Sequence, residues 1–595
     1  MSPRRTATGG RIDRLKTIRF TFDGKSYTGH AGDTLASAML ANGVSLFGRS
    51  FKYHRPRGLL TAGVDEPNAL VTVLRGEARE PNIPATVIEI YDGLKVESQN
   101  RFPSLAWDFH AVNQLGGKLL SAGFYYKTFM GPAVGPLKGT RFWMFCEHFI
   151  RRAAGLGRAG TVGDKARYER MNAFCDTLVV GSGPAGLMAA RAASESGANV
   201  ILAELGPRFG GSANWSGETI DAMPADEWAK LAAEELGKLE NVRLLPRTTV
   251  WGYYDGNTLA ALERVTDHKQ APAKGEPRHR CWTVRAKKVV LATGAFERPL
   301  VFPGNDRPGV MLADAARRYA HEFGVLPGEK IALFTNNDSA YQVAVALKNA
   351  GAQIAAIIDV RTEPSSAMRA LADEAGAELL AGHAVVATEG SKALSGVKVQ
   401  RFDAASGNLS GDARSIHADC LLMSGGWSPA IHLASQAGAK AEWSVKRQAF
   451  LPPHPTQDWI GAGAFAGSFS TAEAIAEGHA AGVSAAGAKS SPTDLPVVEA
   501  VPFDPDPAPV FEIRAGGKSF VDFQHDVTAE DVRLAHREGF ISVEHLKRYT
   551  TLGMATDQGK TSNVPGLAIM AETLGKPIPE VGTTRFRPPF TAVSI

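Results

Sequence analysis

The chain of 595 residues is poor in cysteine, with only Cys146, Cys175, Cys281 and Cys420. The four are far apart and form no CxxC pair, which argues against a disulfide framework and against a zinc or iron–sulfur site held by cysteines alone. A redox-active disulfide between close neighbours is excluded as well. We therefore expect four reduced cysteines in a cytoplasmic protein.

The sequence also lacks a long apolar run and a strong charge of either sign. No uninterrupted apolar stretch approaches the ~18 residues of a membrane span, and no apolar core of a secretory signal follows the basic N-terminus MSPRRTATGGRIDRLKT. Lys and Arg number 65 and Asp and Glu 61, so the formal net charge is +4. We expect a multi-domain globular protein with no membrane and no nucleic acid as partner.

The first 100 residues predict a small β-grasp domain. In TIRFTFDGKSYTGH, apolar and polar residues alternate around Asp23-Gly24, which indicates a hairpin. The following GDTLASAMLANG predicts a short helix with Asp33 or Thr34 as N-cap. A hairpin followed by a helix is typical of the β-grasp arrangement.

Two aromatic regions follow. The basic run FGRSFKYHRPRGLL, Phe47–Leu60, fits a solvated loop or a domain contact, or else an anion-binding loop for phosphates. Residues 101–170 form an irregular connection, and we interpret its aromatic residues as packing between domains or subunits. These residues are Trp107, Phe109, Phe124, Tyr125, Tyr126, Phe129, Phe142, Trp143 and Phe145.

The remaining chain divides at a stretch rich in Pro, Ser and Asp, residues 486–510, which is typical of a linker. Before it the pattern is α/β. After it, residues 511–595 predict a small helical unit, with Thr528 capping one helix through Asp531 and Ser542 capping the next.

A dinucleotide fingerprint opens the α/β region. The strand DTLVV is followed by GSGPAG and a helix, and ANVILAEL is the next strand. Gly181 allows the tight turn, Gly183 lets the backbone approach a pyrophosphate, and Gly186 lets helix and strand pack closely. Glu204 lies 18 residues after Gly186 (204 − 186). A carboxylate there accepts from a ribose diol and repels a 2′-phosphate, so the pattern favours NAD or FAD over NADP.

Three further segments match one recurring pattern. They are PRFGGSA after the acidic tip, KKVVLATGAFERP with Ala292-Thr293-Gly294, and DWIGAGAFAGSFSTAEAIAEG from Asp458 to Gly478. Together with the fingerprint they resemble the two-dinucleotide-binding-domain flavoproteins, which include the disulfide reductases. The resemblance implies a dinucleotide-binding domain over residues 171–325 and 380–485.

The middle unit, residues 326–379, departs from that family. EKIALFTNNDSAYQVAVAL predicts a strand, a turn and a helix, but Thr335–Ala340 stands where a second glycine-rich fingerprint would be. Without those glycines a pyrophosphate could not approach closely. We therefore expect one competent dinucleotide site, and no hydride transfer from a pyridine nucleotide to a flavin within this chain.

Both ends of the chain resemble iron–sulfur domains without their cysteines. The C-terminal unit resembles bacterioferritin-associated-ferredoxin-like domains, and its cysteine positions correspond to Asp522, Gln524, Asp557 and Ser562. The N-terminal β-grasp unit resembles a plant-type ferredoxin, and its loop at 48–63 has no cysteine. No thiolate is present at these places, so we expect no cluster and no metal.

Essentially the whole chain resembles the α subunits of heterotetrameric sarcosine oxidases. The resemblance lies in the order of the units and in the segments GRSFKYHRPRG, GSGPAG, VEHLKRYTTLGMATDQGKTSN and VGTTRFRPPF. The resemblance implies NAD bound in the GSGPAG site without turnover, FAD and the amine site in the β subunit, and FMN at the α/β interface, with γ and δ subunits completing the heterotetramer. The family's α subunit continues into a folate-binding domain about where this sequence stops. A fragment, a split gene and a variant without folate coupling all stay open.

The same resemblance implies the site residues, and no catalytic residue is expected in this chain. The residues expected to contact the dinucleotide are Gly181, Ser182, Gly183, Pro184, Ala185, Gly186, Glu204, Leu205, Gly206, Gly211, Ser212, Val250, Thr293, Gly294, Ala464, Phe469 and Thr471. Those expected near the FMN phosphate are Thr550, Thr551 and Lys560, flanked by Lys547 and Arg548. A solvated basic helix end is the alternative there.

We expect a subunit of a complex that oxidises sarcosine, a small N-methyl amino acid, to glycine, formaldehyde and hydrogen peroxide. The α subunit of an N-methylglutamate or opine dehydrogenase is a close alternative. A stand-alone FAD- or NAD(P)H-dependent oxidoreductase would need a second glycine-rich site or a redox disulfide. A non-catalytic nucleotide-binding assembly factor is the remaining alternative.

Overall fold

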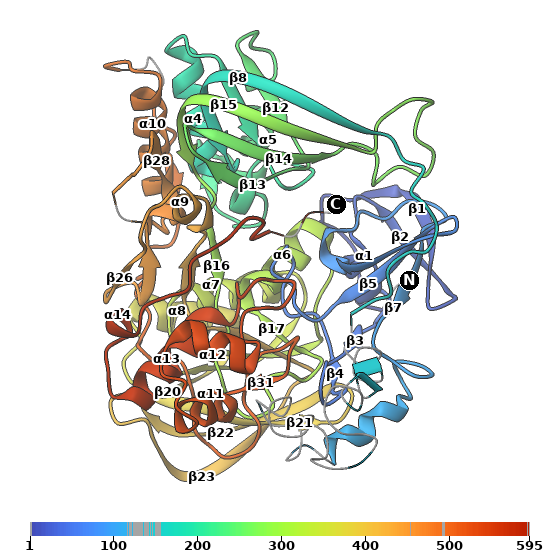
Figure 1. The fold of residues 1–595 in the computed structure, drawn as a ribbon. Coiled ribbons are helices and arrows are strands. Elements are labelled where there is room, and N and C mark those ends of the chain that lie inside the picture. The colour runs from blue at the N-terminus through green and yellow to red at the C-terminus, as the bar shows by residue number, and fades with distance from the viewer. Residues whose placement is uncertain are drawn as a thin grey trace.

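The computed structural model of the protein describes residues 3–115, 156–452, 454–490, 494–591 and 593. It also describes residues 117, 122, 135, 142, 144, 145, 147 and 148. The nucleotide-binding sheet lies at the top of the view in Figure 1, the β-grasp domain at the right and the C-terminal helices at the lower left.

The N-terminal unit is a β-grasp domain, as predicted. Its sheet has the order β2-β1-β7-β5-β6, and β1 pairs antiparallel with β2 and parallel with β7. Asp23 and Gly24 both have positive φ, 49° and 76°, which suits the two-residue turn between β1 and β2. Thr34 caps α1 in a capping box with Ser37, and every residue of α1 is buried. The bounds are β1 (Asp13–Phe22), β2 (Lys25–Ala31), α1 (Leu35–Ala41), β5 (Leu70–Arg75), β6 (Ala78–Pro84), η1 (Ala85–Val87) and β7 (Lys95–Ser98).

The basic run after this helix is a contact between domains. It forms the two short strands β3 (Gly48–Arg49) and β4 (Pro56–Arg57). Arg57 is 1% exposed and forms ion pairs with Asp306 of the core and Asp526 of the C-terminal unit. Of the predicted alternatives, the structure supports the domain contact, because the guanidinium group of Arg57 is already neutralised inside the chain.

The predicted aromatic packing can be checked only in part. Phe124–Phe129 and Trp143 lie outside the described residues. Trp107 is 71% exposed and Phe109, in η2 (Phe109–Gln114), is 64% exposed. These two rings do not pack between domains of this chain, so packing against a partner protein stays a prediction.

The nucleotide-binding sheet has the order β12-β9-β8-β15-β14-β13, with β28 beside β15. Strands β12, β9, β8, β15 and β28 run parallel, and β13 and β14 complete an antiparallel meander. The strands are β8 (Tyr168–Val180), β9 (Val200–Ala203), β12 (Val242–Leu245), β13 (Thr248–Tyr254), β14 (Thr258–Arg264), β15 (His279–Leu291) and β28 (Trp459–Gly461). The helices are α4 (Pro184–Glu195), η3 (Gly211–Asn214), α5 (Ala225–Leu236), η4 (Gly463–Ala466) and α10 (Thr471–Ala485).

A second, fully parallel sheet with the order β17-β24-β18-β19-β20 forms the middle unit. It is larger than the 326–379 assigned from the sequence, because it takes in strands on both sides of that range and an added three-stranded sheet. The strands are β17 (Val310–Leu312), β18 (Lys330–Thr335), β19 (Gln353–Asp359), β20 (Glu378–Ala381), β21 (His383–Gly390), β22 (Leu394–Asp403), β23 (Asn408–His417) and β24 (Cys420–Ser424). The helices are α6 (Ala313–Phe323), α7 (Ser339–Asn349) and α8 (Ser366–Ala375).

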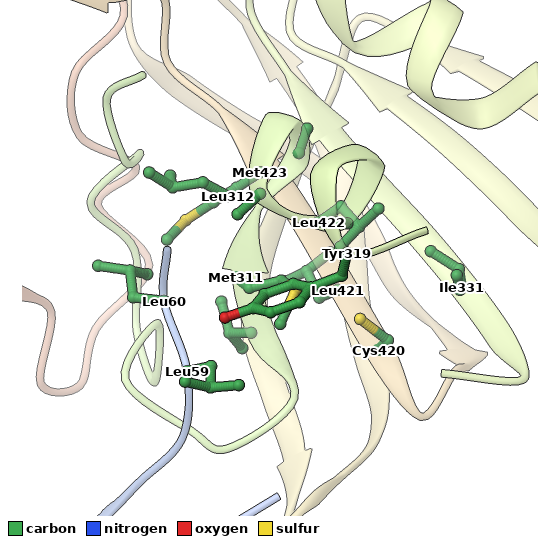
Figure 2. Close-up of a cluster of buried hydrophobic side chains, with 14 of the residues drawn as sticks. Leu59, Leu60, Met311, Leu312, Tyr319, Ile331, Cys420, Leu421, Leu422 and Met423 are labelled. Carbon is green, nitrogen blue, oxygen red and sulfur yellow. The ribbon is translucent and has the colours of Figure 1, made fainter. Parts of the chain in front are cut away.

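The β-grasp loop docks on this second sheet. Figure 2 shows Leu59 and Leu60 against Met311 and Leu312 of β17, with Tyr319 of α6 beside them. The Leu312 N–H donates to the Leu60 carbonyl at 2.8 Å. All these side chains are buried, so the N-terminal domain and the second unit share one apolar core.

Short elements connect the units. They are β10 (Thr219–Ile220), β11 (Met223–Pro224), β16 (Ala295–Glu297), β25 (Trp427–Pro429), α9 (His432–Gln436), β26 (Glu442–Ser444), β27 (Ala449–Leu451) and β29 (Val498–Glu499). The predicted linker is not detached, because β29 pairs with β10.

The C-terminal unit is helical, and both predicted caps are present. The Thr528 hydroxyl accepts from the Asp531 N–H in a capping box, and Ser542 caps the next helix through the His545 N–H. The elements are β30 (Phe520–Asp522), β31 (Val527–Thr528), α11 (Ala529–Arg537), α12 (Val543–Thr550), α13 (Asn563–Leu574) and α14 (Ile578–Val581). None of the helices within the described ranges has the length and apolarity needed to cross a bilayer.

Candidate functional site

The first βα turn, between β8 and α4, opens its backbone to a cavity. Gly181 has a φ of +93°, and a Cβ there would lie 2.3 Å from the Ala292 carbonyl oxygen, so only glycine fits. At Gly183 a Cβ would meet no atom within 4 Å, because this residue lines the cavity. No side chain caps α4. Its first N–H groups and the positive end of its dipole therefore remain available to a pyrophosphate.

Glu204 follows β9 at one end of this cavity. Its Oε2 accepts from the Ser182 N–H at 3.0 Å and from the Ser182 hydroxyl at 2.6 Å, and its Oε1 accepts from the Gly206 N–H at 2.7 Å. Burial raises the pKa of this carboxyl, and the bonds from Ser182 and Gly206 oppose the rise. A carboxylate has about four acceptor positions. Glu204 is thus held in place with capacity left for a ribose hydroxyl.

The cavity has a volume of about 370 Å³ and brings most of the predicted dinucleotide residues together. The predicted residues in its wall are Gly181, Ser182, Gly183, Pro184, Ala185, Glu204, Leu205, Gly211, Ser212, Val250, Thr293, Gly294, Ala464, Phe469 and Thr471. Gly186 and Gly206 are not in the wall. A Cβ at Gly186 would lie 1.9 Å from the Gly181 carbonyl oxygen, so Gly186 serves the close packing of the helix on the turn.

The first turn of α10 forms the opposite wall. Glu477 accepts from the Gly463 N–H at 2.8 Å and from the Ser468 hydroxyl at 2.5 Å, which ties the preceding turn to the helix. The Thr471 hydroxyl donates at 2.6 Å to Glu218, a residue between η3 and β10. The cavity is therefore enclosed between the N-terminal ends of two helices, α4 and α10.

Sequence reasoning missed a large part of the wall. The additional lining residues include Val64, Trp215, Ser216, Glu218, Asp314, Arg317, Ser339, Gln342, Trp427, His432, Phe503 and Thr591. Asp314 fixes two of them, since it accepts from Trp215 Nε1 at 3.0 Å and from Arg317 at 2.6 Å. These residues come from the β-grasp loop, the segment after η3, the second unit, the connecting segments and the C-terminal segment. No local motif marks them, because only the tertiary fold brings them to the cavity.

The second βα turn, Thr335–Ser339, is closed by the chain itself. The Asn336 side chain donates to the Ala508 carbonyl at 2.9 Å, and the Ala508 N–H donates back to the Asn336 carbonyl at 2.9 Å. Asp338 accepts from the Asp504 N–H at 3.0 Å. The segment that the sequence suggested as a linker thus covers the place where a second dinucleotide would approach.

The three predicted FMN residues are engaged inside the C-terminal unit. The Thr550 hydroxyl donates to the Leu546 carbonyl at 2.8 Å. Lys560 is 6% exposed, and its ammonium donates to the carbonyls of Phe590 at 2.7 Å and Asp557 at 3.0 Å. Thr551, with a φ of +68°, ends α12 and is half-buried. The contacts of Thr550 and Lys560 do not fit a role as open phosphate ligands in this chain.

A buried carboxylate lies just after the cysteine-free N-terminal loop. Glu66 is fully buried and accepts from the N–H groups of Leu60, Thr61, Asn68 and Ala69 at 2.7–3.0 Å. Burial raises the pKa of Glu66 to about 7, although the four hydrogen bonds lower it.

In the C-terminal unit the four predicted cysteine positions are also polar and mostly satisfied. Asp522 accepts from the Gly553 N–H at 3.0 Å, Gln524 from the Thr556 hydroxyl at 2.7 Å, and Asp557 from the Thr561 hydroxyl at 3.0 Å. Ser562 is buried. Nowhere in the described part of the chain do three or more His, Cys, Asp or Glu side chains form a group able to hold a metal.

Comparisons with known proteins give matches to three parts of the chain. Residues 15–101 match the model of the 2Fe-2S iron-sulfur cluster binding domain, residues 175–447 that of pyridine nucleotide-disulphide oxidoreductase, and residues 516–595 that of the sarcosine oxidase A3 domain. The solved structure of L-proline dehydrogenase from P. horikoshii covers all of this chain and 99% of its own, with a TM-score of 0.66 and 20% identity. That likeness supports the fold alone.

Among curated proteins, the chain is 48% identical to the alpha subunit of sarcosine oxidase from Rhizobium meliloti (strain 1021), over 100% of this chain and 59% of that protein. It is 39% identical to the corresponding protein from Corynebacterium sp. (strain U-96), over 98% of this chain and 56% of that protein. An opine oxidase subunit from Agrobacterium tumefaciens (strain Ach5) is 30% identical over 47% of this chain and 58% of that protein. The chain therefore spans less than two thirds of the length of these relatives.

Proposed function

This chain is related over its whole length to the α subunits of sarcosine oxidases, and on that premise we propose that it is the nucleotide-binding subunit of a cytoplasmic enzyme that oxidises sarcosine. The whole enzyme would convert sarcosine, O2 and water to glycine, formaldehyde and hydrogen peroxide. The β subunit would carry FAD and the amine site, and γ and δ subunits would complete the heterotetramer. The 48% identity over the full chain carries this proposal, and it favours sarcosine over the opine alternative, whose 30% identity covers less than half of the chain.

We propose NAD as the dinucleotide of the cavity. The open α4 N-terminus suits a pyrophosphate, and the remaining acceptor capacity of Glu204 suits a ribose diol. The residues of this chain would bind and orient NAD between α4 and α10. NAD can in general accept a hydride, but the second βα turn leaves no place from which a second dinucleotide could supply one. The proposed role of NAD is therefore structural.

The FMN part of the proposal rests on a smaller set of residues. Lys547 and Arg548 lie in the last turn of α12, next to Thr551. We propose that this surface faces the FMN at the interface with the β subunit, while Thr550 and Lys560 serve the interior of the domain. No proton or hydride transfer is assigned to residues of this chain.

The test of the NAD proposal uses two matched glycine variants. In Gly183→Ala the new methyl group meets no atom of the described residues but enters the place of the pyrophosphate, so we expect a folded protein that has lost at least nine tenths of its NAD. Gly163 is equally free of neighbours within 4 Å and does not line the cavity, so Gly163→Ala should keep its NAD. Full NAD content in both variants would contradict the assigned site.

The test of the catalytic proposal uses the assembled enzyme and the chain alone. Sarcosine-dependent oxygen consumption should appear only when the chain is expressed with its partner subunits. NADH oxidation by the purified chain alone would instead favour a stand-alone reductase, which the buried second turn disfavours.

A further inference from the structure

One wall of the dinucleotide cavity comes from the C-terminal segment. The chain leaves α14 at Val581, and residues 586–591 then run to the space between the nucleotide-binding sheet and the β-grasp domain (Figure 1). Phe590 and Thr591 are 6% and 7% exposed, and Thr591 lines the cavity together with Leu205 and Thr249. This wall is remote in sequence from every dinucleotide motif of the chain.

The same segment borders a second cavity as well. A second cavity of about 520 Å³ is lined by residues of β6, β13 and β14. Val64, Leu205, Thr249 and Thr591 line both cavities. Because Thr591 belongs to both walls, its displacement would remove wall atoms that the two cavities share and would give the dinucleotide cavity a larger exit.

Lys560 holds this segment from the side of the C-terminal unit. Its ammonium donates to the Phe590 carbonyl at 2.7 Å and lies 3.7 Å from the centroid of the Phe590 ring. A buried ammonium is costly unless its donors are used. Burial lowers the pKa of Lys560 to about 8, while the charges of Asp557 and Asp65 oppose the fall. One side chain thus binds both the backbone and the ring of Phe590.

His432 holds the same ring from the side of the cavity. The Phe590 ring stacks on the imidazole with centroids 4.8 Å apart and planes 30° apart. His432 is 5% exposed and lines the cavity, and its Nδ1 has no hydrogen-bond partner among the described residues. Burial and the nearby Lys560 charge lower its pKa to about 3, so the ring is neutral. Phe590 is therefore held between the C-terminal unit and the cavity wall.

We propose that Lys560 and Phe590 are positioning residues that hold segment 586–591 as a fixed wall of the dinucleotide cavity, so that bound NAD does not exchange with solvent. The inference rests on the proposed NAD site and adds how NAD is retained. It also gives Lys560 a role different from the FMN contact that the resemblance implied.

The test measures the exchange rate of the bound dinucleotide in the full chain. Protein carrying its own NAD is incubated with an excess of isotope-labelled NAD, and the unlabelled NAD remaining on the protein is followed by mass spectrometry. We expect Lys560→Met and Phe590→Ala to exchange at least tenfold faster than the wild type. Phe590→Leu, which keeps most of the apolar volume, should fall between. Lys576 is exposed beyond α13, so Lys576→Met is the matched control and should exchange at the wild-type rate.

The outcomes separate this inference from the NAD proposal. Wild-type retention of NAD together with unchanged exchange in Lys560→Met and Phe590→Ala would overturn the inference and leave the NAD proposal standing. FAD in the wild-type site would overturn the NAD proposal, and the same exchange measured with labelled FAD would still test the wall. A wild type that holds no dinucleotide would overturn both. Melting temperatures measured beside each exchange rate identify a variant that has merely lost its fold.

Discussion

The first and second βα turns occupy corresponding places between parallel strands of two sheets, but their surroundings differ. At the first turn, Gly183 faces a cavity and α4 has no side-chain cap. At the second turn, Asn336 and Asp338 are 1% and 3% exposed and are bonded to the segment from Asp504 to Val510. The same local topology thus opens on a cavity in one unit and forms a packing contact in the other.

The difference shows what leaves a βα turn open to a ligand. Strand, turn and helix are common to both, so they are not sufficient. The first turn has glycines that remove side chains from the path of a ligand. The second turn has polar side chains that bind the chain's own backbone, which satisfies their buried groups and fills the space.

The largest expected effect comes from a side chain at the first turn. Gly181→Val should lose all bound NAD and destabilise the protein by about 3 kcal/mol or more, because the Cβ meets the Ala292 carbonyl and φ is +93°. NAD content and thermal unfolding measure the two losses. Gly183→Ala should lose NAD with an unchanged melting temperature of the NAD-free protein, and equal destabilisation of both variants would contradict the account of the turn.

A smaller effect is expected at the junction of the two units. Glu297 of β16 is buried and accepts from the Asp314 N–H at 2.8 Å. Burial, together with the charge of Asp314, raises its pKa to about 8. A raised folded-state pKa contributes stability that is present below the unfolded value near 4.5 and is lost as the pH rises through 8.

Glu297→Gln should therefore raise the melting temperature at pH 8 and leave it nearly unchanged at pH 5. The expected gain at pH 8 is a few kcal/mol. A fall in melting temperature at pH 8 would show that the carboxylate form is needed at the junction.

The smallest effect is expected at the second turn. Asp338→Ala removes the bond to the Asp504 N–H and one of two carboxylate partners of Arg361, which keeps Asp359. We expect the free energy of unfolding to fall by about 1–2 kcal/mol and the NAD content to stay unchanged.

Glycines placed at 336 and 338 together should not create a second site, because residues 504–510 still cover the turn. Two NAD per chain in that double variant would contradict this explanation.

The sequence predicted the local geometry at the first turn, because its determinants lie close together in the chain. Gly181, Gly183 and Glu204 belong to one βαβ unit, and the helix caps at Thr34, Thr528 and Ser542 depend on neighbours three residues away. The fold class and the glycine turn followed from such short patterns, and most of the residues that the resemblance implied lie in the wall of the cavity.

The rest of the cavity could not be predicted because it depends on distant contacts. Trp215, Asp314, His432 and Thr591 reach the cavity from different units. The ammonium group of Lys560 could bind a phosphate, yet it donates to the Phe590 carbonyl inside the domain. The packing of the domain determines this contact, and no pattern in the neighbouring sequence indicates it.

The central claim is one structural NAD per chain and no flavin, and the most direct measurement is the ligand content of the purified chain. The chain is expressed alone, denatured with acid, and the released nucleotides are identified and quantified by mass spectrometry. The account predicts NAD at about one per chain, with neither FAD nor FMN. FAD at one per chain would contradict it and would make this chain an electron carrier in its own right.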